Sequence, residues 1–322
     1  MPDVVSLGEI LVEIMRKERD VPHYVPGVYL GPYPSGAPAI FIDAVARLGA
    51  SAGFIGVVGD DDFGKMLIER LKKDGVDISH IKILPGYTTG TAFVMYYSSG
   101  ERKFVFHLRH SAAGQLCAED VDVGYIATAK YLHIMGSALS VSDSSKDACY
   151  KAAIEAKRRG IKISFDPNLR PELLDVRIIR RICAPMIALS DIIMPSEGEA
   201  MALTGKDNPI DAGKDLLKLG AEIVVIKMGA RGSILMTRGE IIYEPAYEVN
   251  EVDPTGAGDV FDGAFIVGLL KGWNLRNCLE FANAAGAIKV MNFGPMEGPK
   301  NMSEVIQFMK TAKKRRIELN YI

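Results

Sequence analysis

Residues 253–265 decide the fold and read Asp253-Pro254-Thr255-Gly256-Ala257-Gly258-Asp259-Val260-Phe261-Asp262-Gly263-Ala264-Phe265. A Pro-Thr turn leads into three small residues, and the apolar pattern that follows predicts a helix over 257–271. Small residues allow a ligand to approach the backbone closely. The first amides of a helix have no internal acceptor and lie at the positive end of its dipole. The amides of residues 256–259 would therefore bind an anion such as a phosphate.

The carboxylate of Asp259 would lie in the same turn as these amides. A carboxylate beside a phosphate cradle is the arrangement that phosphoryl transfer to a hydroxyl requires, with the carboxylate as general base. The alternative is a glycine-rich helix start in which Asp259 only opposes the helix dipole. This segment by itself leaves both interpretations open.

Around this segment, short β-rich runs alternate with helical runs along the whole chain. Several of the β-rich runs are continuously apolar, as strands are when helices cover both faces of a sheet. The alternation predicts an α/β fold with a mostly parallel sheet and crossover helices. The predicted strands are 4–7, 54–58, 131–135, 161–165, 192–194 and 223–226, and the predicted helices are 38–48, 62–74, 143–159, 178–188, 210–219, 257–271, 275–291 and 303–316.

Residues 88–108 interrupt the alternation. Two β-rich runs, 91–97 and 102–108, flank a glycine-containing turn and predict a hairpin. A second excursion, punctuated by proline and glycine, covers 15–35. We expect both to form a small β lid on one domain that spans residues 1–322; the alternative is that the hairpin extends the central sheet. Because such a lid has exposed strand edges, we expect a homodimer joined through it.

The composition excludes several classes of protein. With 48% hydrophobic and 24% charged residues over 322 positions, the chain is globular rather than disordered. Its formal net charge of −2 offers no field that would attract nucleic acid. No apolar run approaches the length of a membrane span, and the N-terminus lacks a signal-peptide pattern. Four cysteines without a C-x-x-C pair suit a reducing cytoplasm, where we expect the protein to reside.

Several well-known motifs are missing from the sequence. There is no G-x-x-x-x-G-K-[ST] loop, and no G-x-G-x-x-G follows the first predicted strand, so a dinucleotide-dependent dehydrogenase loses its main support. The sequence also contains no H-E-x-x-H and no G-x-S-x-G.

Residues 253–265 resemble the C-terminal signature of the PfkB, or ribokinase-like, family of carbohydrate kinases, and the likeness spans the chain. Within the family, the segment 165–170 resembles the branch of fructokinases and 2-keto-3-deoxygluconate kinases. The other segments that resemble the family are Ser35-Gly36-Ala37-Pro38-Ala39, the run 53–64, Pro195-Ser196-Glu197-Gly198-Glu199-Ala200, Lys227-Met228-Gly229-Ala230-Arg231-Gly232, and Asn283.

The resemblance implies a ribokinase-like three-layer αβα domain with a small β lid, and an ATP-dependent sugar kinase. Asp259 would take a proton from the sugar hydroxyl, and the amides from Gly256 to Asp259 would form the anion hole. Glu199 would orient Mg²⁺ through water, and Asp253 would help to hold a monovalent cation, expected to be K⁺. The residues implied to bind the nucleotide are Lys227, Gly229, Gly232, Thr255, Gly256, Gly258 and Asn283.

The sugar side departs from the family pattern. The chain has Ser35-Gly36-Ala37 where the family commonly has Gly-Gly-Asn, Glu13 where an early Asp is usual, and Ser196 in place of the Asn of Asn-x-x-Glu. By the resemblance, the acceptor side would comprise Glu13, Gly36, Ala37, Arg109, Arg170 and Asp259.

Arg109 and Arg170 could grip a carboxylate, although ordinary surface ion pairing is the alternative for both. We therefore expect a small keto-sugar or keto-sugar acid as the acceptor. A nucleoside or ribose kinase of the same fold, and a non-catalytic sugar or nucleotide sensor, remain the alternatives.

Overall fold

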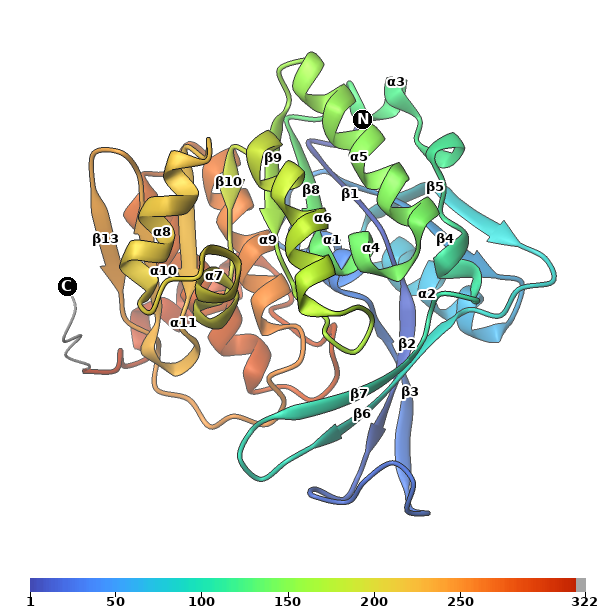
Figure 1. Ribbon diagram of the computed structural model, residues 1–322. Helices are drawn as coiled ribbons and strands as arrows, with labels where there is room; N and C mark the ends of the chain where they lie inside the picture. Colours follow the sequence, from blue (N-terminus) through green and yellow to red (C-terminus); the bar gives the residue numbers. More distant parts are fainter. Residues whose placement is uncertain (317–322) are drawn as a thin grey trace.

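The computed structural model describes residues 1–316 and contains a nine-stranded central sheet in the order β13-β12-β11-β10-β9-β8-β1-β4-β5 (Figure 1). All neighbouring strands pair in parallel except β11-β12 and β12-β13, which are antiparallel. The sheet is therefore mostly parallel, as the sequence predicted. Its strands are β1 (Val4–Leu7), β4 (Ala52–Gly59), β5 (Val76–Leu84), β8 (Tyr131–Met135), β9 (Lys162–Asp166), β10 (Ile192–Ile193), β11 (Ile223–Lys227), β12 (Ser233–Met236) and β13 (Ile241–Glu244).

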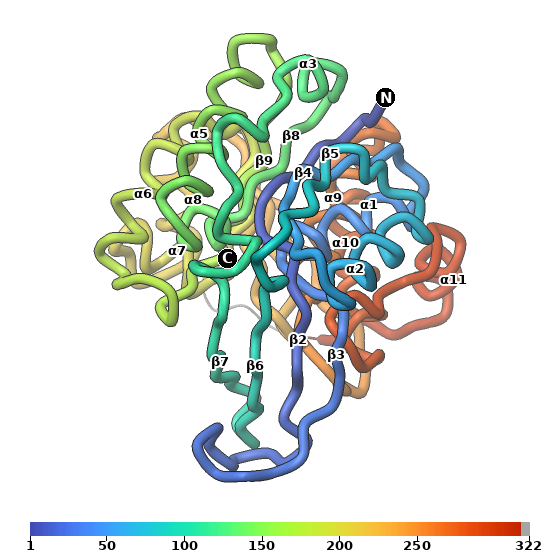
Figure 2. The backbone as a smooth tube through the Cα atoms, turned by 90° about the vertical axis from the view of Figure 1, so that its right-hand side faces the viewer, coloured from blue at the N-terminus to red at the C-terminus, as the bar shows by residue number. Residues whose placement is uncertain are grey.

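Helices cover both faces of this sheet, which gives the expected three layers (Figure 2). Successive side chains of a strand point to opposite faces, so Val4 packs in one apolar cluster, while Val5 and Leu7 pack in the other. The helices are α1 (Ala37–Arg47), α2 (Asp62–Lys73), α3 (Val123–Ile126), α4 (Gly136–Val141), α5 (Asp143–Arg158), α6 (Val176–Leu189), α7 (Glu197–Thr204), α8 (Pro209–Lys218), α9 (Ala257–Leu270), α10 (Leu275–Val290) and α11 (Met302–Thr311). Helices α1, α9 and α10 contribute to the first cluster, and α5, α6 and α8 to the second.

A second sheet of four strands projects from the body of the molecule, as Figures 1 and 2 both show. Its strands, in spatial order, are β3 (Tyr29–Ser35), β2 (Leu11–Arg16), β6 (Gly90–Tyr96) and β7 (Arg102–His107). The predicted hairpin is β6-β7, and it pairs with β2 rather than with the central sheet, so the alternative that it extends that sheet is wrong. The first excursion enters the small sheet at Leu11, four residues before the predicted boundary.

Some elements differ from the prediction. The edge strand β5 was not expected, because its polar and apolar residues alternate and its outer side is exposed. The short helix α7 was missed because it spans two turns and depends on a capping box between Ser196 and Glu199. The last helix ends at Thr311 rather than at 316. Among residues 1–316, no helix combines the length and apolar character that a membrane span requires.

Candidate active site

Two cavities meet at the carboxyl ends of the parallel strands, where ligands of open α/β sheets bind. The first encloses about 210 Å³ between the small sheet, the end of β9 and the start of α9. The second encloses about 370 Å³ between the β11-β12 loop, α9 and α10, and is the roomier of the two. Residues that line both cavities are Arg102, Ser196, Lys227, Pro254 and Gly258. A molecule in one cavity would thus adjoin a molecule in the other.

The start of α9 lies between these cavities and has the geometry that the sequence predicted. Gly256 is the N-cap and has a φ of 84°, in the left-handed region that favours glycine. A Cβ at this position would also clash with the carbonyl oxygen of Pro295. The amide of Ala257 donates to the carbonyl of Pro254 at 3.2 Å. Within the described residues, the amides of Gly256, Gly258 and Asp259 have no backbone acceptor, so they remain available to an anion.

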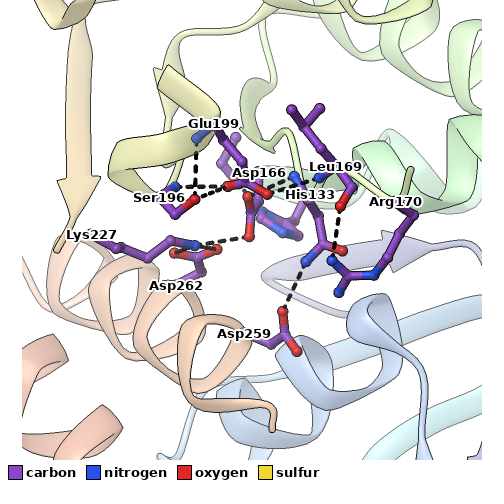
Figure 3. Close-up of polar contacts among 11 residues, drawn as sticks. His133, Asp166, Leu169, Arg170, Ser196, Glu199, Lys227, Asp259 and Asp262 are labelled. Carbon is purple, nitrogen blue, oxygen red and sulfur yellow. Dashed lines mark hydrogen bonds and ion pairs between the residues drawn. The ribbon is translucent and has the colours of Figure 1, made fainter. Parts of the chain in front are cut away.

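The carboxyl of Asp259 lines the first cavity and is only 7% exposed. Burial, followed by the nearby charge of Asp166, raises its pKa to about 7, although Lys227 and Arg170 oppose the shift. The side-chain amide of Asn168 lies 3.4 Å from Asp259 Oδ1, and Figure 3 shows the carboxyl below Arg170 and away from the Lys227 cluster. A carboxylate with a pKa near neutrality that faces a cavity is suited to accept a proton.

Lys227 lies in a buried ionic cluster at the boundary of the two cavities (Figure 3). Its Nζ is 2.8 Å from Asp166 Oδ2 and 3.0 and 2.9 Å from the two carboxylate oxygens of Asp262. Burial alone would lower the pKa of Lys227, but these two carboxylates raise it above its usual range. The ammonium is therefore charged and fixed beside Gly258, where a Cβ would lie 3.5 Å from it.

Glu199 also lines the first cavity, and its carboxylate already accepts hydrogen bonds from the protein. Oε1 accepts from the amide of Leu169 at 2.8 Å, and Oε2 accepts from the amide and hydroxyl of Ser196, both at 2.8 Å. Serine thus caps α7 in place of the usual asparagine. Residues 1–316 contain no cluster of three or more carboxylate, histidine or cysteine groups that could hold a metal ion. Glu199 fits a magnesium ion reached through water better than one bound directly.

Two further carboxyls lie in the first cavity. Glu13 is 3% exposed and accepts from Ser35 Oγ at 2.9 Å; Glu9, also 3% exposed, follows strand β1. Burial raises the pKa of each to about 7. Gly36 and Ala37 complete this wall, and Gly36 has a φ of 107° with the carbonyl oxygen of Glu9 2.5 Å from where a Cβ would be.

The structure separates the two arginines that the sequence assigned to the acceptor. Arg170 lines the first cavity, but Arg109 is exposed and lines neither cavity. The reason is that β7 ends at His107 and the chain turns there, with the amide of Ser111 donating to the carbonyl of Leu108. Arg102, from the same hairpin, lines both cavities instead and donates to Thr255 Oγ1 at 3.2 Å.

The residues predicted on the nucleotide side divide in a similar way. Gly229, Gly232 and Asn283 line the second cavity, whereas Thr255 lines the first. The Asn283 amide donates to the carbonyl of Glu244 at 3.1 Å and accepts from Ser233 Oγ at 3.1 Å, so it fixes the wall of the cavity.

Asp253 lines neither cavity and is 1% exposed. Its carboxylate accepts from the Tyr96 hydroxyl and from the amides of Thr255 and Gly294, each at 3.0 Å. The Lys289 ammonium donates to its backbone carbonyl at 2.9 Å.

Sequence reasoning missed Glu9, Arg102, Asp166, Asp262 and Lys289. Glu9 and Asp166 lie at or just beyond the ends of the predicted strands 4–7 and 161–165, and that position is a usable signal. Arg102 and Lys289 had no such signal, because they come from β7 and α10. Asp262 lies in α9 itself, but its pairing with Lys227 of β11 depends on how the two elements pack.

Comparisons with known proteins show which proteins this chain is similar to. The pfkB family carbohydrate kinase profile matches residues 1–301. The chain is 33% identical to the 2-dehydro-3-deoxygluconokinase of Thermoproteus tenax, over 96% of this chain and 95% of the relative. It is 34% identical to fructokinase-1 of Zea mays, over 96% of this chain and 98% of that relative.

Two solved structures extend the comparison to bound ligands. A protein from Escherichia coli provisionally named ribokinase II, solved with ATP and Mg²⁺, is 44% identical with a TM-score of 0.90, over 96% of this chain and 99% of that chain. A double mutant of the fructokinase from Vibrio cholerae O395, solved with fructose, ADP and a potassium ion, is 27% identical with a TM-score of 0.85, over 95% and 98%.

The left-handed turn before α9 generates a testable prediction. Gly256→Ala should lower the free energy of unfolding by more than Gly272→Ala does. Both glycines have positive φ, 84° and 71°, but only Gly256 would place its Cβ against a backbone carbonyl. Backbone strain alone costs roughly 1–2 kcal/mol, and the clash adds to it. Urea denaturation of the two variants measures the difference; equal losses would contradict the packing described here.

Proposed function

Since the chain belongs to the pfkB family of carbohydrate kinases and is an ATP-dependent sugar kinase, we propose that it phosphorylates a hydroxyl of a small keto-sugar or keto-sugar acid, with Asp259 as general base. The observation that carries this proposal is the position of the buried Asp259 carboxyl. It lies in the cavity on the acceptor side, one residue after an amide with no backbone acceptor. A nucleophile and a phosphate bound in the two cavities would meet at this point.

In the proposed reaction, the acceptor hydroxyl loses its proton to Asp259 as its oxygen attacks the γ-phosphorus of ATP. The bond from the γ-phosphorus to the β,γ-bridging oxygen breaks, and ADP leaves with that oxygen. The amides of Gly256, Gly258 and Asp259 would stabilise the charge that develops on the transferred phosphoryl group. The Lys227 ammonium, held by Asp166 and Asp262, adds a fixed positive charge beside Gly258. Each group is in position before the reaction, so little reorganisation is needed during it.

We propose that ATP occupies the second cavity, against Gly229, Gly232 and Asn283. Magnesium bound to ATP would neutralise phosphate charge, and Glu199 would orient it through water. We do not assign a potassium ion to Asp253, because its backbone carbonyl and its carboxylate already contact the ammonium of Lys289.

The residues that line the first cavity favour a small keto-sugar, or a keto-sugar acid that also carries a carboxylate, as the acceptor. The lining of the first cavity includes the carboxyl of Glu13, the small residues Gly36 and Ala37, and the guanidinium groups of Arg102 and Arg170. A hydroxyl-rich sugar would pair with the carboxyls of Glu9 and Glu13, whereas a carboxylate would pair with the arginines. The relatives named 2-dehydro-3-deoxygluconokinase and fructokinase-1 represent these two acceptor types.

We further propose that the small sheet, formed within about 15–35 and 88–108 and entered at Leu11, acts as a lid on a single domain spanning residues 1–322. It supplies Arg102 to both cavities, so its closure would exclude water from the reacting groups.

All four cysteines are free thiols and three are buried, which supports our proposal of a cytoplasmic location.

Replacing Asp259 by Asn should lower kcat by roughly 10²- to 10⁴-fold, the usual contribution of a general base. ATP binding should be retained, because the amides and the second cavity are unchanged. Release of ADP is measured over a panel that includes fructose, 2-dehydro-3-deoxygluconate, ribose and nucleosides. The exposed Asp207→Asn variant is the matched control. A folded Asp259→Asn variant with near-normal turnover would refute the assignment, and ligand binding without turnover of the unaltered protein would favour a sensor.

The pH dependence of kcat/KM should report the titration of Asp259. A general base must be ionised, and the pKa of Asp259 is raised to about 7. We therefore expect kcat/KM to increase as the pH rises through about 7, and to be low at more acidic pH, where Asp259 is protonated. The negative charge of Asp166 contributes to the raised pKa, so Asp166→Asn should move the acidic limb to lower pH. Glu9 and Glu13 also titrate near 7, but Asp166 is not a cause of their shifts. An unmoved limb would assign it to those residues instead.

We also propose a homodimer joined through the small sheet. Among the described residues its outer strands β3 and β7 have unpaired edges. Val105 of β7 is 40% exposed, and Tyr24 and Val28, in the connection between β2 and β3, are 86% and 51% exposed. Light scattering at micromolar concentration should give twice the chain mass of 35.0 kDa. A value equal to one chain would contradict this.

A further inference from the structure

A fully buried ammonium lies behind the loop that begins α9. The side chain of Lys289, in the last turn of α10, is 0% exposed. Its Nζ donates to the backbone carbonyl of Asp253 at 2.9 Å and to that of Asn292 at 3.1 Å, and lies 3.6 Å from Asp253 Oδ2. The two carbonyls accept hydrogen bonds from the ammonium, and the carboxylate forms an ion pair with it. Burial lowers the pKa of Lys289, and the charge of Asp253 opposes that shift. A buried charge is tolerated only with such partners.

The oxygens around Lys289 belong to the two segments that shape the anion hole. One segment is 253–259, which carries the unpaired amides. The other is 292–295, whose Gly294 amide donates to Asp253 Oδ2 at 3.0 Å and whose Pro295 carbonyl packs against Gly256. Lys289 therefore joins the two segments through their carbonyl oxygens.

This arrangement does not fit the monovalent cation that the family resemblance assigns to Asp253. Backbone carbonyls and a carboxylate are the ligands that a small hard cation would need, but here they already surround the Nζ of Lys289. A second cation at these oxygens would be repelled by the ammonium at close range, in a region with little water to screen the charges.

We propose that the Lys289 ammonium takes the place of a monovalent cation, so that this protein holds its anion hole with a covalently attached charge and does not depend on K⁺. Lys289 is a positioning residue, since it acts through the backbone carbonyls of Asp253 and Asn292. The C-terminal end of a helix, where Lys289 lies, also favours positive charge. The inference rests on the proposed function only where it treats residues 256–259 as the anion hole.

The unaltered protein provides the first test. After removal of alkali cations, its melting temperature and its ADP release, quantified directly by chromatography, are compared in potassium chloride and in tetramethylammonium chloride at equal ionic strength. A ligand that binds only the folded state raises the melting temperature with its concentration. We expect neither readout to differ between the two salts. A rise in melting temperature or in turnover that is specific to K⁺ would overturn the proposal.

Two variants provide the second test. Lys289→Ala removes the charge and leaves space among the oxygens, so K⁺ should raise both its melting temperature and its turnover. Lys289→Met removes the charge but fills the space, so K⁺ should leave it unchanged. Lys271→Ala, on an exposed residue, is the control for loss of a lysine. Full stability and turnover of Lys289→Ala without K⁺, or no response of this variant to K⁺, would contradict the proposal.

The melting measurements keep this inference separate from the proposed function. They require no acceptor and no catalysis, so a failure of the Asp259 assignment would leave their outcome unaffected. If either variant does not fold, the salt comparison on the unaltered protein still decides the question.

Discussion

The site depends on a few backbone amides that have no hydrogen-bond acceptor in the backbone and that lie where the two cavities meet. Gly256, Gly258 and Asp259 remain open because the turn before α9 adopts a left-handed conformation at Gly256. A loop with so few internal hydrogen bonds must be fixed from outside. Asp253 provides this by accepting from Tyr96 of the small sheet and from Gly294 of the loop after α10. The proposed anion hole thus depends on three separate segments.

Buried charges are arranged so that only some of them titrate near neutrality. Lys227 lies between two carboxylates and remains charged, while Asp259 has no ammonium or guanidinium in direct contact among the described residues. Burial then raises the pKa of Asp259 toward the pH at which a general base is effective. Glu9 and Glu13 share this environment on the acceptor side, and their pKa values rise for the same reason.

The small sheet is joined to the reacting region as well as covering it. Tyr96 of β6 lies 2.9 Å from Thr255 Oγ1, and Arg102 at the start of β7 reaches the same hydroxyl. Movement of the sheet would therefore change contacts at the α9 turn as well as access to the first cavity. This coupling gives a physical basis for linking lid closure to assembly of the site.

The α/β class, the hairpin of the small sheet and the start of α9 could be predicted from the sequence, because hydrophobic periodicity, turn glycines and helix-start signals are local properties. Asp259 at the start of α9, and Gly36 and Arg170 in segments that resemble the family, line the first cavity. Tertiary structure alone decided that Arg102 and not Arg109 enters the site, and that Lys289 contacts the oxygens of Asp253. The physical reason is that both outcomes depend on contacts between residues far apart in the chain. Such contacts decide where a side chain at the end of a strand points, and which backbone oxygens lie within reach of the Lys289 ammonium.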